Sequence, residues 1–122
     1  MLVLSESAAP PAQTPGWKPA RPIEIIVGVS PGGGIDRTAR TLQRIMQDKR
    51  YIEVATTVIN KPGGGGAIAW SSLNQHPGDA HWVATMNVAL LTNAIIGAST
   101  LRYQDLTPLA ILMREYIAVW TR

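Results

Sequence analysis

The feature that most constrains this sequence is a glycine-rich stretch between an apolar run and an amphipathic segment. The apolar run, residues 23–29, is bounded by turn residues and predicts a buried strand. Residues 37–50 carry apolar side chains at helical spacing, which predicts a helix. Three consecutive glycines, Gly32, Gly33 and Gly34, therefore lie between the end of a strand and the start of a helix.

A glycine-rich junction of this kind favours binding of a small anion. The first amides of a helix have no partner within the helix, and the helix dipole makes that end positive. Glycine suits the position because a Cβ would hold a ligand away from those amides and would disfavour positive φ. The alternative interpretation of the glycine run is a simple tight turn.

The same order of strand, glycine loop and helix occurs a second time. A strand rich in Val, Ile and Thr is predicted over 52–59, glycines follow at 63–66, and a short helix is predicted over 67–75. A third strand is predicted over 82–86 and a further helix over 90–96, and two more strand-like runs cover 107–113 and 116–120.

This alternation predicts an α/β fold, a three-layer open parallel sheet with helices on both faces. In such a sheet the ligand crevice lies at the carboxyl ends of the strands. Both glycine loops, and Asn87 after the third strand, belong at that edge, so we expect them to converge on one ligand. Asn87 has an alternative role as a helix cap, and so does Asp36.

Composition bounds the functional class. A chain of 122 residues fits one small domain, and 46% hydrophobic with 16% charged residues fits a globular fold. The absence of cysteine excludes disulfides, thiolate metal sites and cysteine nucleophiles. The net charge is +3 without a basic run interleaved with aromatics, which argues against nucleic acid. No metal is expected, because His76 and His81 lack a third ligand at usable spacing.

Three enzyme motifs offer alternative interpretations of these glycine loops. Residues 28–32 match G-x-S-x-G, but Pro31 has no N–H for an oxyanion, and no acid followed by a histidine is suitably placed downstream. A phosphate-binding P-loop fails because no Lys-Ser/Thr pair follows its glycines. Residues 64–69 fit G-x-G-x-x-A, although Asn87 ends the next strand where an acid is expected. A dinucleotide-binding, Rossmann-like oxidoreductase fragment therefore stays as an alternative.

Several longer motifs occur in order along the chain: WKP-x-RPI-x-IIV from Trp17, SPGGG-x-D-x-x-AR from Ser30, VINKPGGGG from Val58, PGD at Pro77 and L-x-Y-x-DLTPLA from Leu101. Together they resemble the substrate-binding proteins of tripartite tricarboxylate transporters, also called Bug-type periplasmic receptors. The chain departs from the family pattern at 77–80, where the usual Pro-Asp-Gly-Tyr turn reads Pro-Gly-Asp-Ala.

The resemblance implies a two-lobed, flytrap-like periplasmic receptor without catalytic residues or cofactor. Such receptors capture a small organic acid and deliver it to membrane permease subunits, and they hold the carboxylate partly through backbone groups and water. Carried onto this chain, the family's ligand-binding loops correspond to Ser30, Pro31, Gly32, Gly33, Gly34 and Asp36 in the first loop and to Gly64, Gly65, Gly66 and Ala67 in the second.

The expected domain organisation is a disordered segment over 1–16 and an incomplete N-terminal lobe over 17–122, with the second lobe absent. Residues 1–16 are rich in Ala, Pro, Ser and Gln and have little to bury. Their apolar patch at 2–4 is too short for a signal-peptide core, and it fits either the remnant of a processed leader or an unrelated start. A truncated chain that binds nothing is a further alternative.

Overall fold

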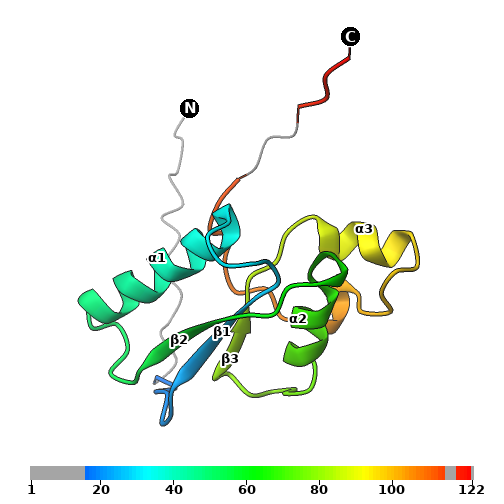
Figure 1. The fold of residues 1–122 in the computed structure, drawn as a ribbon. Coiled ribbons are helices and arrows are strands. Elements are labelled where there is room, and N and C mark those ends of the chain that lie inside the picture. Colours follow the sequence, from blue (N-terminus) through cyan, green and yellow to red (C-terminus); the bar gives the residue numbers. More distant parts are fainter. Residues whose placement is uncertain (1–15, 115–117, 122) are drawn as a thin grey trace, which may run out of the picture.

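The computed structural model describes residues 16–114 and 118–121. At its centre is a three-stranded parallel sheet with strand order β2-β1-β3, formed by β1 (Ile23–Val27), β2 (Thr56–Asn60) and β3 (Trp82–Ala84) (Figure 1). The central strand pairs with both neighbours: Ile25 lies opposite Val58 of β2 and Val83 of β3. Disorder is expected for residues 1–16. All of these except Gly16 lie outside the described residues.

A helix follows each strand, and the first two helices return the chain to the start of the next parallel strand. These helices are α1 (Gly34–Asp48), α2 (Ala67–Leu73) and α3 (Ala89–Ile95). Short 3₁₀ turns cover Gly64–Gly66 and Tyr103–Asp105. Within the described residues, none of the helices has the length and apolarity needed to cross a membrane.

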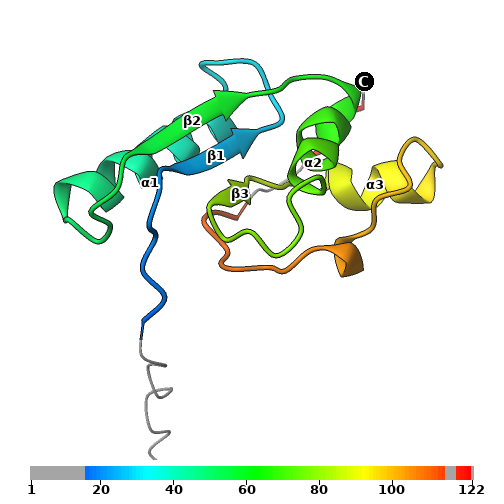
Figure 2. The ribbon, with the colours of Figure 1, turned by 90° about the horizontal axis from the view of Figure 1, so that it is seen from below.

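The sheet has a hydrophobic core on each face, because successive side chains of β1 point in opposite directions. Ile25 and Val27 pack on one face with Ala39 of α1. Ile26 packs on the other face with Trp70 of α2 and with residues of and beyond α3. Figures 1 and 2 show α1 on one side of the sheet and α2 and α3 on the other. The predicted three-layer α/β architecture is confirmed, and burial on both faces explains why β1 is apolar without alternation.

The strand predicted over 107–113 is wrong. These residues form no strand, and Leu109 and Ile111 are 78% and 88% exposed. A strand requires a neighbour whose backbone pairs with it, and within the described residues no backbone hydrogen bond joins 107–114 to a strand. The run predicted over 116–120 falls partly on residues 115–117, outside the described part of the chain, and residues 118–120 form no strand.

Trp70 is the largest fully buried side chain, and its replacement tests this core. It is 2% exposed, and its indole Nε1 donates to the carbonyl of Thr85 over 3.1 Å. We expect Trp70→Ala to lower the free energy of unfolding by about 3–5 kcal/mol, measured by urea denaturation followed by circular dichroism. Trp120 is 89% exposed, so Trp120→Ala should change it by less than about 0.5 kcal/mol. Equal losses in the two variants would contradict the core described here.

Candidate functional site

The two glycine-rich loops leave the same edge of the sheet and enclose a recess. We call residues 28–33, after β1, the first loop and residues 61–66, after β2, the second loop. The recess has a volume of about 150 Å³ and is lined by Gly28, Val29, Ile35, Gly65, Gly66, Trp70, Thr85, Asn87 and Ala89. Three of the predicted site residues, Gly65, Gly66 and Asn87, therefore border one cavity.

The other predicted residues of the first loop lie beside this recess. Ser30, Pro31, Gly32, Gly33 and Gly34 connect two residues that line it, and all five are exposed. A larger depression of about 480 Å³ lies at the opposite edge of the sheet, between the end of α1 and the start of β2, and neither glycine loop contributes to its lining. The recess between the loops is therefore the candidate site.

The two loops approach each other at the level of the main chain. A Cβ added to Gly28 would lie 2.8 Å from the Cα of Gly66, which is closer than real Cβ contacts come. A Cβ added to Gly66 would lie 2.7 Å from the ring of Trp70, and the φ of Gly66 is +99°. Glycine is required at both positions because there is no room for a side chain.

The second loop has a backbone that few other sequences can adopt. Its four glycines have φ values of 130°, 57°, 60° and 99°, all in the region that residues with a Cβ avoid. Asn93 of α3 holds the loop from behind, where its Nδ2 donates to the carbonyl of Gly64 over 2.9 Å. Asn93 is 8% exposed. Sequence reasoning missed it, because one Asn in a short amphipathic run looks like a surface residue.

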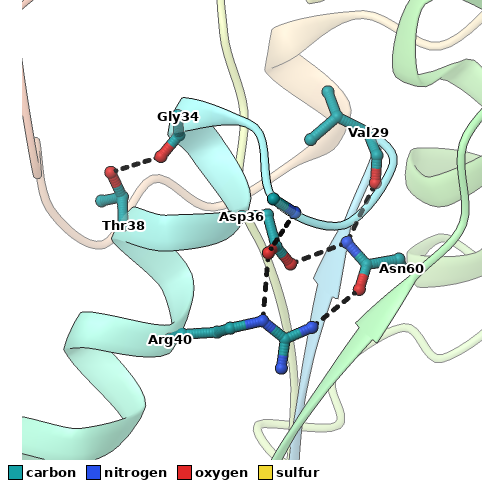
Figure 3. A network of polar contacts seen from close by, with 7 residues as sticks. Val29, Gly34, Asp36, Thr38, Arg40 and Asn60 are labelled. Atoms are coloured by element: carbon teal, nitrogen blue, oxygen red, sulfur yellow. Dashed lines mark hydrogen bonds and ion pairs between the residues drawn. The ribbon is translucent and has the colours of Figure 1, made fainter.

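The first loop is held by Asp36, which is 2% exposed (Figure 3). Its Oδ2 accepts from the amide of Gly32 over 2.8 Å and from Nε of Arg40 over 3.0 Å, and its Oδ1 accepts from Nδ2 of Asn60 over 2.8 Å. The hydrogen bonds from these donors, of which the one from Arg40 has the largest effect, lower the pKa of Asp36 from 3.8 to about 2. Asp36 thus binds the loop before its helix, and both of its oxygens are engaged within the protein.

Asn60 extends this network to the end of β2. Its Nδ2 also donates to the carbonyl of Val29 over 2.9 Å, and its Oδ1 accepts from a guanidinium nitrogen of Arg40 over 3.1 Å. One amide side chain therefore joins the first loop, α1 and β2. Sequence reasoning did not single out Asn60, although a polar residue directly at the carboxyl end of a predicted strand is a usable signal.

Asn87 caps α3 and borders the recess, and its contact with a ligand stays a prediction. Its Oδ1 accepts the amide of Ala89 over 3.0 Å and so caps the first turn of α3, while the residue also lines the recess.

The chemistry available at this edge suits an anion. The amides of Gly34, Ile35 and Asp36 are the first of a 15-residue helix and have no carbonyl one turn earlier to accept their hydrogen bonds. The positive end of the helix dipole lies there as well. Within the described residues no group of three or more His, Asp or Glu side chains is placed to hold a metal ion.

Known proteins resemble a limited part of this chain. No protein-family model matches it. The UPF0065 protein of the tcbD–tcbE intergenic region of Pseudomonas sp. strain P51 is 32% identical over 75 residues, which are 62% of this chain and 22% of that protein. Protein BugT of Bordetella pertussis is 38% identical over 63 residues, 52% of this chain and 19% of that protein. The matched stretch thus spans about a fifth of the length of these relatives.

A solved structure extends the likeness to three dimensions. The crystal structure of a TctC solute-binding protein from Polaromonas superposes with a TM-score of 0.65 at 31% identity, over 71% of this chain and 30% of that one. Together with the curated relatives, it shows that the chain belongs to the Bug/TctC family of tripartite tricarboxylate receptors. The family predicted from the sequence motifs is confirmed, and at the level of the family the role is solute binding and not catalysis.

Two glycine substitutions test whether the loops depend on close backbone contact. Gly66→Ala places a methyl group against Trp70 at positive φ, and we expect a loss of about 1–3 kcal/mol in the free energy of unfolding. Gly34→Ala is the matched control, because a Cβ there meets nothing within 4 Å and the position is helical. It should be neutral or stabilising by up to about 1 kcal/mol. Urea denaturation measures the free energy of unfolding of both variants. A Gly66→Ala variant as stable as Gly34→Ala would contradict the close contact.

The lowered pKa of Asp36 predicts a dependence of stability on pH. Because the pKa of the folded state, about 2, is below the ordinary 3.8, Asp36 stabilises the fold above pH 3.8 and this contribution is lost as the pH falls toward 2. Hydrogen bonds from His81 and from Arg21 lower the pKa of Asp79 in the same way, to about 2.

We expect Asp36→Asn to be less stable than the wild type at pH 7 and to lose less stability between pH 4 and pH 2. Asp79→Asn should remove a separate part of the same dependence, and the double variant should show the smallest dependence of the three. Urea unfolding at pH 7, 4 and 2 measures this. An unchanged pH dependence in Asp36→Asn would rule out the network as its source.

Proposed function

We propose that this chain is the ligand-binding part of a receptor that captures a small organic carboxylate between its two glycine loops. One observation supports the proposal above the others: the loops after β1 and β2, and Asn87 after β3, meet around a single recess at the carboxyl edge of the sheet. Ligands of open parallel sheets bind at that edge. Membership of a family of solute-binding proteins is consistent with it.

The contacts proposed for the ligand use main chain and not charged side chains. The exposed glycines Gly33 and Gly34 leave the start of α1 open to an oxyanion. The second loop is proposed to contribute Gly64, Gly65 and Gly66, together with Ala67, the first residue of α2. Val29, Ile35, Trp70 and Ala89 offer an apolar wall for the hydrocarbon part of the ligand. The proposed ligand is therefore a small acid with an apolar body of a few carbon atoms.

The wider setting of this site is also proposed from the family. Residues 17–122 would form part of the N-terminal lobe of a two-lobed periplasmic receptor that passes its acid to membrane permease subunits. The relatives matched are a Bug protein and a TctC solute-binding protein, which supports this setting.

The alternative is a dinucleotide-binding oxidoreductase fragment. Residues 64–69 do lie between β2 and α2, as a G-x-G-x-x-A fingerprint requires. Against it, β3 is followed by Asn87 and not by an acid that could bind a ribose. A thermal-shift assay separates the two functions, because NAD should stabilise only the oxidoreductase and small acids only the receptor.

Gly33→Val tests the first loop directly. Gly33 has φ of −70° and ψ of 169°, and an added Cβ would come no closer than 3.7 Å to its neighbours, so the fold should accept valine. We expect at least a tenfold loss of carboxylate affinity, about 1.4 kcal/mol, because the side chain shields the first amides of α1. Isothermal titration calorimetry with acetate, succinate, citrate and glutamate measures this.

Gly16→Val is the matched control, since nothing lies within 4 Å of a Cβ there. If a titrated acid binds Gly33→Val as tightly as the wild type, the first loop is not part of the site.

A further inference from the structure

We propose that Asp36 and Asn60 are positioning residues that hold the two glycine loops at the separation a ligand requires, without touching the ligand. This inference rests on the proposed function. Every side-chain polar atom of these two residues has a partner within the protein, and together they connect the first loop to α1 and β2.

The pair binds the first loop at two points. Asp36 accepts from the amide of Gly32, and Asn60 donates to the carbonyl of Val29. These two backbone groups lie on either side of Ser30 and Pro31, so the turn between them is fixed at both ends (Figure 3). Gly32 has φ of +89°, a conformation that the hydrogen bond to Asp36 helps to select.

The second loop begins directly after Asn60. Asn60 is the last residue of β2, and the following amide, that of Lys61, donates to the carbonyl of Val27 over 2.8 Å. The second loop therefore leaves the sheet next to the first, and Asn93 fixes its far side at Gly64. Asp36 and Asn60 thus connect the first loop to the root of the second.

Asp36 also decides which amides remain for an anion. Its carboxylate already occupies the amide of Gly32, and the guanidinium of Arg40 balances its charge at 3.0 Å. Arg40 is the charged group of the described residues in contact with it, and the remaining neighbour, Asn60, is neutral. An internal carboxylate thus takes the amide of Gly32, near the end of the first loop, and a ligand carboxylate is left with the amides from Gly33 onward.

The test compares Asp36→Asn with the exchanged pair Asp36→Asn/Asn60→Asp. In Asp36→Asn the new amide nitrogen faces Nδ2 of Asn60. Both groups are donors, so the hydrogen bond between residues 36 and 60 is lost. The exchanged pair restores one donor and one acceptor in reverse order and leaves Arg40 an oxygen on each residue, although the carbonyl of Val29 loses its donor. Asp48→Asn is the matched control, because Asp48 is exposed at the other end of α1.

The first readout is affinity by isothermal titration calorimetry with succinate, citrate and glutamate. We expect Asp36→Asn to lose affinity by about ten- to a hundredfold, the range typical of removing a residue that orients a metal ligand, which is an analogous positioning role. The exchanged pair should recover part of that loss, and Asp48→Asn should equal the wild type. Wild-type affinity in Asp36→Asn overturns the inference while leaving the proposed function intact.

The second readout needs no ligand. In nuclear magnetic resonance spectra the amide proton of Gly32 should shift with the ionisation of Asp36, with a midpoint below pH 3.8, and Asp36→Asn should abolish the shift. Hydrogen exchange at residues 28–35 and 61–66 should accelerate together in Asp36→Asn. If no acid binds the wild type, the proposed function fails. The coupling of the two loops is then still tested by the chemical shift of Gly32 and by hydrogen exchange. Acceleration in the first loop alone overturns it.

Discussion

The contact between Gly28 and Gly66 sets the geometry on which the rest of the site depends. Parallel pairing brings the ends of β1 and β2 to one edge, but strands about 4.8 Å apart do not oblige the loops that follow to stay together. The loops stay together because neither glycine carries a Cβ, so that the main chain after β1 lies against the main chain before α2. The indole of Trp70 fills the space beneath, which joins the site to the core.

The two loops are held by different physical means. The first depends on a buried carboxylate and its donors, among them Arg40 and Asn60, so its order is electrostatic and sensitive to acid. The second depends on four glycines at positive φ and on the single amide of Asn93. In both loops the exposed glycines, Gly32, Gly33 and Gly34 in and beside the first and Gly63, Gly64 and Gly65 in the second, leave the main chain without a covering side chain of its own. Such bare main chain at the start of a helix is consistent with the proposed binding of an oxyanion.

Much of this arrangement was predictable from the residues. The periodicity over 37–50 and the glycines before it located α1, and the apolar run at 23–29 identified the buried strand β1. The strand predicted over 107–113 failed because apolar character shows that a segment prefers burial and contains no information about which strand would pair with it. Asn60 and Asn93 were missed for a related reason, since an amide side chain is as common on a surface as in a buried network.

The sequence by itself determined the order of the first three strands and their helices, the two glycine junctions and the family, since these follow from local periodicity and from motifs read along the chain. Only the tertiary structure decided that Asp36 turns back onto Gly32, that Asn60 bridges the first loop and β2, and that Gly28 meets Gly66. Each of these contacts joins atoms whose distance depends on how the strands pair and how the helices pack. The periodicity of a sequence predicts which way a side chain faces, but it does not identify the residue that the side chain contacts.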